Sequence, residues 1–202
     1  MSRAPWWVGR WTAYCRRATN SAVKPAAVLV LLLLSLLPAG GQPKAIIVIR
    51  HGEKPDDPEA LHLSKEGVAR SKALVAFFTK DKHVARFGSP DILIASHPTH
   101  KGHGQRPRET LVPVASKLKL EIDTPFESKD YARLAQVLFT DARYQGKIVV
   151  ICWVHEHLPA LAGALGVTPE PPKWKDSDYD TAYVITYPEG KAHLKLVTQN
   201  FH

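Results

Sequence analysis

The sequence predicts an α/β domain, a three-layer sandwich whose mostly parallel central sheet carries helices on both faces. Short apolar runs rich in β-branched residues, at 45–49, 91–95 and 147–153, have the character of buried strands. Between these runs, apolar residues recur at helical spacing. Strands that alternate with helices indicate parallel strands joined by helical crossovers, which cover the sheet on both sides.

The first half of the domain is expected to supply two strands and two helices. The strand at 45–49 runs into a turn-rich stretch, and Ser64 is the predicted N-cap of a helix that ends near residue 80. The second strand, 91–95, leads into a polar loop. A helix is expected over 108–119, with Pro113 in about its first turn, where proline is tolerated.

The second half is expected to add a helix over 130–140 and the most hydrophobic strand, 147–153. A short helix over 158–165 should end at Gly166. The stretches 181–187 and 192–197 are expected to form a terminal hairpin. Residues 169–180 are interpreted as a surface loop, because too little chain follows them for a second domain. Residues 42–202 are therefore predicted to form one domain.

Residues 1–41 have the features of a signal peptide or membrane anchor. Five of the eight excess positive charges lie in residues 1–43, which contain no acidic residue. The twelve uncharged, mostly apolar residues at 26–37 are short of the roughly 20 that a spanning helix needs, and Pro38-Ala39-Gly40-Gly41 follows them. This pattern is typical of a secretory signal, with an uncleaved anchor as the alternative. We expect an exported protein, periplasmic or anchored in the inner membrane, that meets the membrane only through this segment.

Composition excludes several other classes of protein. The rest of the chain carries 22 basic and 19 acidic residues without a Lys/Arg block among aromatic residues, which argues against a nucleic-acid partner. Two cysteines, Cys15 and Cys152, exclude a disulfide-dense scaffold and a zinc site made of cysteines alone. Cys152 lies within an apolar strand and is expected to be a buried small hydrophobe. Nothing in the sequence predicts the oligomeric state.

Reactive side chains gather where the predicted strands end. The first strand runs into Arg50-His51-Gly52-Glu53, the second leads to Ser96 and then Arg106, and the third leads to His155-Glu156-His157. Ligands of α/β sheets bind beyond the carboxyl ends of the strands. Guanidinium groups match phosphate oxygens, and a neutral imidazole can attack phosphorus. A second histidine can donate to the oxygens of the transferring group. The pattern therefore predicts a site for a phosphoryl group.

These motifs resemble those of the histidine phosphatase superfamily, whose fold is called phosphoglycerate mutase-like. Arg50-His51-Gly52 after a buried strand resembles the nucleophile motif of that family. Arg106-Pro107-Arg108-Glu109-Thr110 resembles its second arginine motif, and 153–161 its second histidine motif. The resemblance covers roughly residues 44–198. It implies a phosphoglycerate mutase-like domain of the small phosphatase branch.

The resemblance also implies residue roles. His51 would form a phosphohistidine intermediate that water hydrolyses, which makes the chain a metal-independent phosphomonoester hydrolase of the histidine acid phosphatase type, without a cofactor. The implied substrate is a phosphorylated small molecule or an envelope phosphate. The phosphate pocket would consist of Arg50, Arg106 and His155, and Glu53 is a further candidate for substrate binding. Spacing to Thr110 favours Arg106 over Arg108 as the pocket arginine.

The proton donor is left open by the sequence. The resemblance favours Glu156, directly after the second histidine, and it leaves Glu53, Glu127 and Asp130 as alternatives. The sequence departs from the family in a longer loop at 97–105, and it has Val154-His155-Glu156-His157 where Gly-His-Ser-Asn is frequent.

The sequence leaves two other functions as alternatives. A non-catalytic member of the same fold would bind a phosphorylated ligand or a protein partner. A metal-binding protein would use some of five histidines, but the His-Glu-x-x-His metalloprotease pattern fails because Pro159 stands four residues after His155. No metal site is therefore expected from these histidines: His97, His100, His103, His155 and His157.

Overall fold

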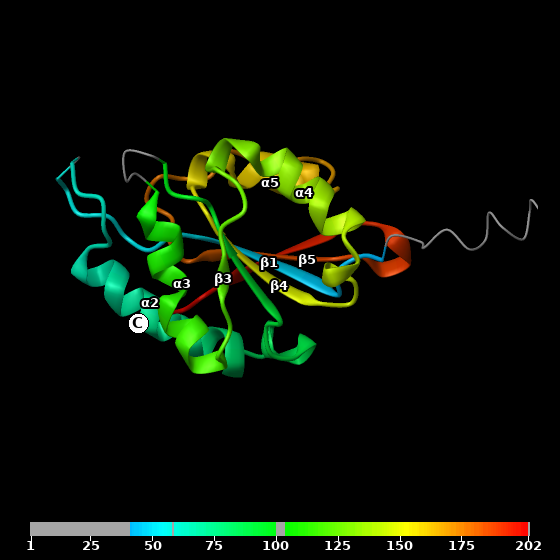
Figure 1. Ribbon diagram of the computed structural model, residues 1–202, viewed down its shortest axis with the longest axis horizontal. Coiled ribbons are helices and arrows are strands. Elements are labelled where there is room, and N and C mark those ends of the chain that lie inside the picture. Colours follow the sequence, from blue (N-terminus) through cyan, green and yellow to red (C-terminus); the bar gives the residue numbers. More distant parts are fainter. Residues whose placement is uncertain (1–40, 58, 100–103, 202) are drawn as a thin grey trace, which may run out of the picture. The chain divides into compact units, whose positions relative to one another are not determined.

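The structure is a computed structural model of the 202-residue chain, and it describes residues 41–57, 59–99 and 104–201 (Figure 1). The expected signal peptide or anchor lies outside the described residues, except for Gly41. His100 and His103 of the loop after the second strand also lie outside them. Within the described ranges, none of the helices combines the length and the apolar character that crossing a membrane requires.

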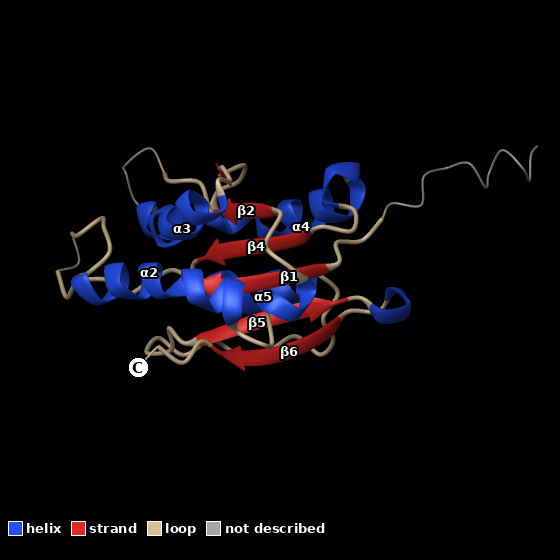
Figure 2. Ribbon diagram, turned by 90° about the horizontal axis from the view of Figure 1, so that it is seen from below, coloured by secondary structure: helices blue, strands red, loops and turns tan. Residues whose placement is uncertain are grey.

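The described residues form a mixed sheet of six strands in the order β3-β2-β4-β1-β5-β6 (Figure 2). Four neighbouring strands run parallel, as expected: β3 (Ile122–Asp123), β2 (Ile92–Ala95), β4 (Ile148–Trp153) and β1 (Ala45–Arg50). The expected terminal hairpin is confirmed, and it consists of β5 (Thr181–Thr186) and β6 (His193–Thr198). Only β3 was not expected, because two residues are too few to leave a recurring pattern.

Strand β1 lies inside the sheet and pairs in parallel with β4, so that Arg50 stands opposite Trp153. The backbone N–H of His51 donates to the carbonyl of Trp153 at 3.1 Å, which extends the pairing one residue beyond β1. Because β1 and β4 point the same way, the residues that follow them lie at the same edge of the sheet. His51 and His155, 104 positions apart in the chain, come near one another for this reason.

Helices cover both faces of the sheet (Figure 1). Alternate residues of β1 point to opposite faces, as the pleat of a strand requires. Ile47 and Ile49 pack in the cluster that includes helices α2 (Lys65–Lys80) and α3 (Gln105–Leu118). Ile46 and Val48 pack in the cluster that includes α4 (Tyr131–Thr140) and α5 (Leu158–Ala164). The predicted three-layer fold class is confirmed.

Helix ends agree with the sequence in α2 and differ in α3. The Ser64 hydroxyl accepts a hydrogen bond of 3.1 Å from the N–H of Gly67, which confirms the predicted N-cap. Helix α3 begins at Gln105, three residues before the expected start, so Pro113 lies in the helix interior and its placement in the first turn was wrong. The proline in the first turn of α3, where proline is tolerated, is Pro107. The early start of the helix was not predicted because residues 105–107 include no apolar residue at helical spacing.

Candidate active site

A small cavity of about 140 Å³ lies at the carboxyl edge of the sheet, beyond β1 and β4. Its walls come from the chain after β1, the first turn of α3 and the chain after β4. The cavity therefore brings together five residues that the sequence singled out, with Lys54, Gly104, Pro107 and Val154 beside them: Arg50, His51, Arg106, His155 and Glu156.

His51 is buried, with 6% of its surface exposed. Its Nδ1 lies 2.7 Å from the carbonyl oxygen of Gly52. A carbonyl only accepts hydrogen bonds, so Nδ1 carries the proton and Nε2 keeps its lone pair in the neutral ring. Burial, assisted by the charges of Arg50 and Arg106, lowers the pKa of His51 to about 4. At neutral pH the imidazole is uncharged, as a nucleophile requires.

Arg50 ends β1 and is 2% exposed. Its Nη1 donates to the carbonyl oxygens of Asp176 at 2.6 Å and Asp178 at 3.1 Å, and its Nη2 donates to the Tyr179 hydroxyl at 3.1 Å. The guanidinium carbon lies 3.8 Å from the centre of the Tyr179 ring. Burial lowers the pKa of Arg50. Nη1 is bound by two carbonyl oxygens, whereas Nη2 has one acceptor for its two N–H groups and Nε has none, so Nε is the nitrogen without a partner.

Arg106 lies in the first turn of α3, where its Nε donates to the carbonyl of His62 at 3.1 Å and its Nη2 to the carbonyl of Ala60. The neighbouring candidate, Arg108, is exposed and is not part of the cavity wall. The geometry therefore agrees with the preference for Arg106 that its spacing to Thr110 indicated.

His155 follows β4 in a short 3-10 turn, η4 (His155–His157), and is partly buried. Its Nε2 lies 3.2 Å from a carboxylate oxygen of Asp176, and its Nδ1 lies 3.1 Å from a carboxylate oxygen of Glu156. Burial and the charge of Arg50 lower the pKa of His155, while the two carboxylates oppose this shift. Asp176 was not identified from the sequence, because it belongs to the stretch interpreted as a surface loop.

Three buried side-chain atoms in the described part of the chain make no hydrogen bond of good geometry: Arg50 Nε, Ser96 Oγ and His155 Nδ1, of which the last has only its ion-pair contact with Glu156. All three residues end or follow strands at the carboxyl edge of the sheet. Buried polar atoms in native proteins are almost always hydrogen-bonded. Unpartnered atoms gathered at one edge therefore indicate a place where a polar ligand binds.

The other carboxylate candidates do not line the cavity. Glu53 binds Arg70, whose Nε donates at 2.8 Å and whose Nη2 lies 2.6 Å from the same oxygen. Glu127 lies 3.2 Å from Lys129, and Asp130 precedes α4. Arg70 holds the Glu53 carboxylate, and Glu53 is not among the residues that line the cavity, so its role in substrate binding stays a prediction.

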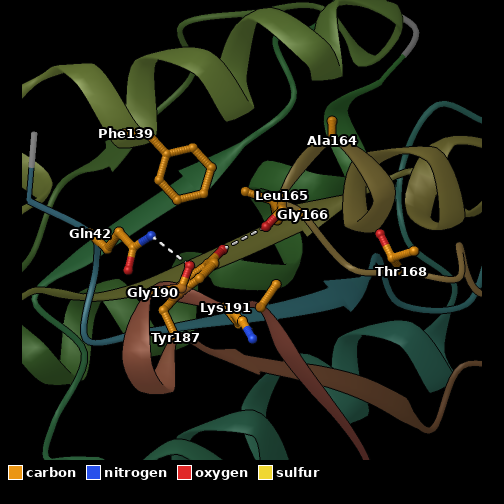
Figure 3. A pocket seen from close by; sticks show the side chains of 10 residues that line it. Gln42, Phe139, Ala164, Leu165, Gly166, Thr168, Tyr187, Gly190 and Lys191 are labelled. Atoms are coloured by element: carbon orange, nitrogen blue, oxygen red, sulfur yellow. Dashed lines mark hydrogen bonds between the residues drawn. The ribbon is translucent and has the colours of Figure 1, made fainter.

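A larger pocket of about 500 Å³ lies near the start of β1 and the turn between β5 and β6 (Figure 3). Gln42 donates to the carbonyl of Gly190 at 3.4 Å there, and the Tyr187 hydroxyl donates to the carbonyl of Leu165 at 3.1 Å. Burial raises the pKa of Tyr187. Histidine and carboxylate side chains do not line this pocket, whereas the smaller cavity is lined by His51, His155 and Glu156 and is the candidate active site.

Comparisons with solved structures identify the fold, although no known protein family or curated protein matches the sequence itself. An α-ribazole phosphatase from Shigella flexneri aligns over 76% of this chain and 96% of its own, with 16% identity and a TM-score of 0.56. The protein histidine phosphatase SixA, solved with tungstate, aligns over 77% and 97%, with 15% identity and a TM-score of 0.55.

A mycobacterial glucosyl-3-phosphoglycerate phosphatase, solved with inorganic phosphate, aligns over 79% of this chain and 100% of its own. It is 12% identical and has a TM-score of 0.54. The chain has the histidine phosphatase fold. The resemblance first indicated by three short motifs is thereby confirmed at the level of the fold, which is what likeness at such low identity establishes. In this histidine phosphatase fold, the candidate residues surround the cavity beyond β1 and β4.

Proposed function

We propose that this protein is a metal-independent phosphomonoester hydrolase that acts through a phosphohistidine on His51. The observation that carries the proposal is the state of the His51 ring. Its Nδ1 is held by the Gly52 carbonyl, its pKa is lowered to about 4, and it lines a cavity with Arg50 and Arg106. A neutral imidazole with one fixed tautomer, set among cations, suits attack on an anionic phosphorus centre.

The first step forms a bond between His51 Nε2 and phosphorus while the bond from phosphorus to the leaving oxygen breaks. The leaving oxygen takes the bonding electron pair and a proton. We assign this proton to Glu156, the one carboxylate among the described residues of the cavity wall. Arg50, Arg106 and His155 offset the charge on the phosphoryl oxygens.

The second step returns the enzyme to its starting state. Water attacks phosphorus, the bond from phosphorus to nitrogen breaks, and the electron pair returns to His51 Nε2. Glu156, now a carboxylate, accepts the proton of the attacking water, as microscopic reversibility requires. The products are the alcohol and inorganic phosphate.

We infer that the substrate is a phosphorylated small molecule or an envelope phosphate. A cavity of about 140 Å³ is large enough to hold a phosphoryl group. Export of the protein remains part of this proposal, and its support comes from the composition of residues 1–41 alone.

Hydrolysis of p-nitrophenyl phosphate in the presence of EDTA tests the proposal. His51→Ala should lower turnover by about 10³-fold or more. The matched control is His157→Ala, because His157 contacts the Tyr131 ring and does not line the cavity. Quenching a reaction with ³²P-labelled substrate in detergent at alkaline pH, where the bond from phosphorus to nitrogen survives, should trap label on the wild-type chain and none on His51→Ala. Equal turnover in wild type and His51→Ala, or loss of turnover in EDTA, would refute the mechanism.

A further inference from the structure

Residues 174–180, here called the strap, connect the loop after α5 to β5 and are held at both ends. At one end Trp174 is 4% exposed, packs 4.8 Å from the Tyr183 ring and donates to the Asp178 carbonyl at 2.8 Å. At the other end the Asp178 carboxylate accepts hydrogen bonds from the backbone of Asp180 and Thr181, each at 3.0 Å. These contacts give the strap a defined course although its composition is that of a polar loop.

The strap binds the Arg50 guanidinium from one side. Arg50 Nη1 donates hydrogen bonds to the carbonyl oxygens of Asp176 and Asp178, and Nη2 donates one to the Tyr179 hydroxyl. The Tyr179 ring also lies against the guanidinium plane, at 3.8 Å from ring centre to carbon. Nη1 is therefore turned toward the strap, and the donors left for an anion are the Nε–H and the second N–H of Nη2.

Tyr179 also reaches the nucleophile. The rings of Tyr179 and His51 meet edge to face, with 6.4 Å between their centres and an angle of 64° between their planes. Through Asp176, the strap further contacts His155 Nε2 at 3.2 Å. One segment therefore touches three of the residues that the proposed mechanism uses.

We propose that Tyr179 is a positioning residue, which fixes Arg50 so that its unpartnered Nε–H is offered to a phosphoryl oxygen. The inference rests on the proposed function for the identity of the ligand. It also accounts for a second observation. Arg50 is only 2% exposed, yet its Nε has no hydrogen-bond partner. A cationic donor left unpartnered in such surroundings is stabilised when an oxyanion binds.

The test uses two variants of Tyr179 and one control. Tyr179→Leu removes the ring and the hydroxyl, and Tyr179→Phe removes the hydroxyl alone. Tyr131→Leu is the matched control, since Tyr131 is a partly buried tyrosine whose ring contacts His157 outside the cavity. Binding of inorganic phosphate is measured by calorimetry, and KM and kcat are measured with p-nitrophenyl phosphate.

Tyr179→Leu should raise the dissociation constant for phosphate and the KM by about ten-fold, because Arg50 loses its stacking partner and one acceptor. Tyr179→Phe should raise both by about three-fold, and Tyr131→Leu should leave both unchanged. A positioning role predicts this graded order in the folded variants, and the control tests whether loss of a partly buried tyrosine elsewhere changes phosphate binding by itself. If Tyr179→Leu fails to fold, Tyr179→Phe decides the question.

The inference would be overturned if Tyr179→Leu folds and binds phosphate as tightly as the wild type. If Tyr179→Leu does not fold, wild-type affinity in Tyr179→Phe would overturn it. Wild-type protein that fails to bind phosphate would also overturn it. Failure of the proposed function gives a different result. Wild type would then bind phosphate without hydrolysing the ester, and the graded loss of phosphate binding in the Tyr179 variants would still support the positioning role.

Discussion

The hydroxyl of Thr110 accepts a hydrogen bond of 2.9 Å from the backbone N–H of Gly52, the residue that follows His51. The same hydroxyl donates to the carbonyl of Arg106 at 2.7 Å, one helical turn earlier in α3. Thr110 is fully buried. A single side chain therefore joins the loop of the proposed nucleophile to the helix that carries the second arginine, which gives a physical reason for the four-residue spacing between Arg106 and Thr110.

Thr110→Val should lower both stability and turnover. Valine has the same shape as threonine but leaves the Gly52 N–H buried without an acceptor, at a cost of about 1–3 kcal/mol. The Gly52 carbonyl that orients His51 belongs to the same loop, so kcat should fall as well. Urea unfolding and turnover of p-nitrophenyl phosphate measure the two effects. Thr110→Ser should restore most of both, and a Val variant equal to wild type in both would show that the hydroxyl is dispensable.

Gly67→Ala should disturb the same loop from the side of α2. A Cβ atom at Gly67 would lie 2.5 Å from the carbonyl oxygen of Glu53 and 2.9 Å from its nitrogen, so backbone would have to move. The matched control is Gly163→Ala in α5, where the added Cβ meets the flexible end of the Glu170 side chain at 3.0 Å.

Alanine is favoured over glycine within a helix by about 1 kcal/mol. Gly163→Ala should therefore leave the thermal midpoint equal or higher. Gly67→Ala should lower both the midpoint and the turnover, despite the same gain in helix propensity. A Gly67→Ala protein as stable and active as the control variant would contradict the close approach of α2 to the loop.

Much of the fold follows from local pattern. The buried strands β1, β2 and β4 were predicted because each is a nearly continuous apolar run. Their parallel order places the polar residues after them at one edge, and this is why the cavity residues could be named from the sequence. The start of α3 was predicted less accurately, because Gln105, Arg106 and Pro107 do not continue the helical spacing of apolar residues.

The strap shows where local pattern is insufficient. Residues 174–180 contain Asp176, Asp178 and Asp180, a composition typical of a solvated loop. The contacts that make the strap part of the site are backbone carbonyls on Arg50, and such carbonyls leave no trace in side-chain composition. The available signal was Trp174, since a large aromatic side chain within a polar stretch is usually buried.

Arg106→Ala and Arg108→Ala should differ strongly although the two residues are neighbours on α3. Arg106 lines the cavity, whereas Arg108 is exposed. Loss of a preorganised donor to a transferring group costs about 10²-fold in rate or more. Loss of an exposed charge should change kcat/KM by about two-fold or less. Steady-state kinetics with p-nitrophenyl phosphate measures both effects. Equal losses in the two variants would show that Arg106 does not bind the phosphoryl group.

Glu156→Gln should slow the hydrolysis of esters whose leaving group is basic, and Glu53→Gln should not. Glu156 lines the cavity, whereas the carboxylate of Glu53 is held by Arg70. A proton donor contributes about 10²–10⁴-fold, and most when the leaving group is basic. Glu156→Gln should therefore impair hydrolysis of an alkyl phosphate far more than that of p-nitrophenyl phosphate. If Glu53→Gln shows this dependence instead, the assigned donor is wrong.

The low pKa of His51 should be visible both in activity and in stability. Burial lowers this pKa from 6.5 to about 4, so the nucleophile stays neutral through mildly acidic conditions. The acid limb of kcat/KM, corrected for ionisation of the substrate, should therefore fall near pH 4 rather than near pH 6.5.

For stability, the unfolded chain binds a proton on His51 between about pH 6.5 and pH 4 that the native chain does not bind. The free energy of unfolding should thus decrease as the pH falls through this window, by about 3 kcal/mol in total, and the loss is complete below the lower value. His51→Ala removes this contribution, so its unfolding free energy should depend less steeply on pH, although His155 also has a lowered pKa. Histidine NMR titration measures the pKa directly, and a His51 resonance that titrates near pH 6.5 would contradict the burial of the ring.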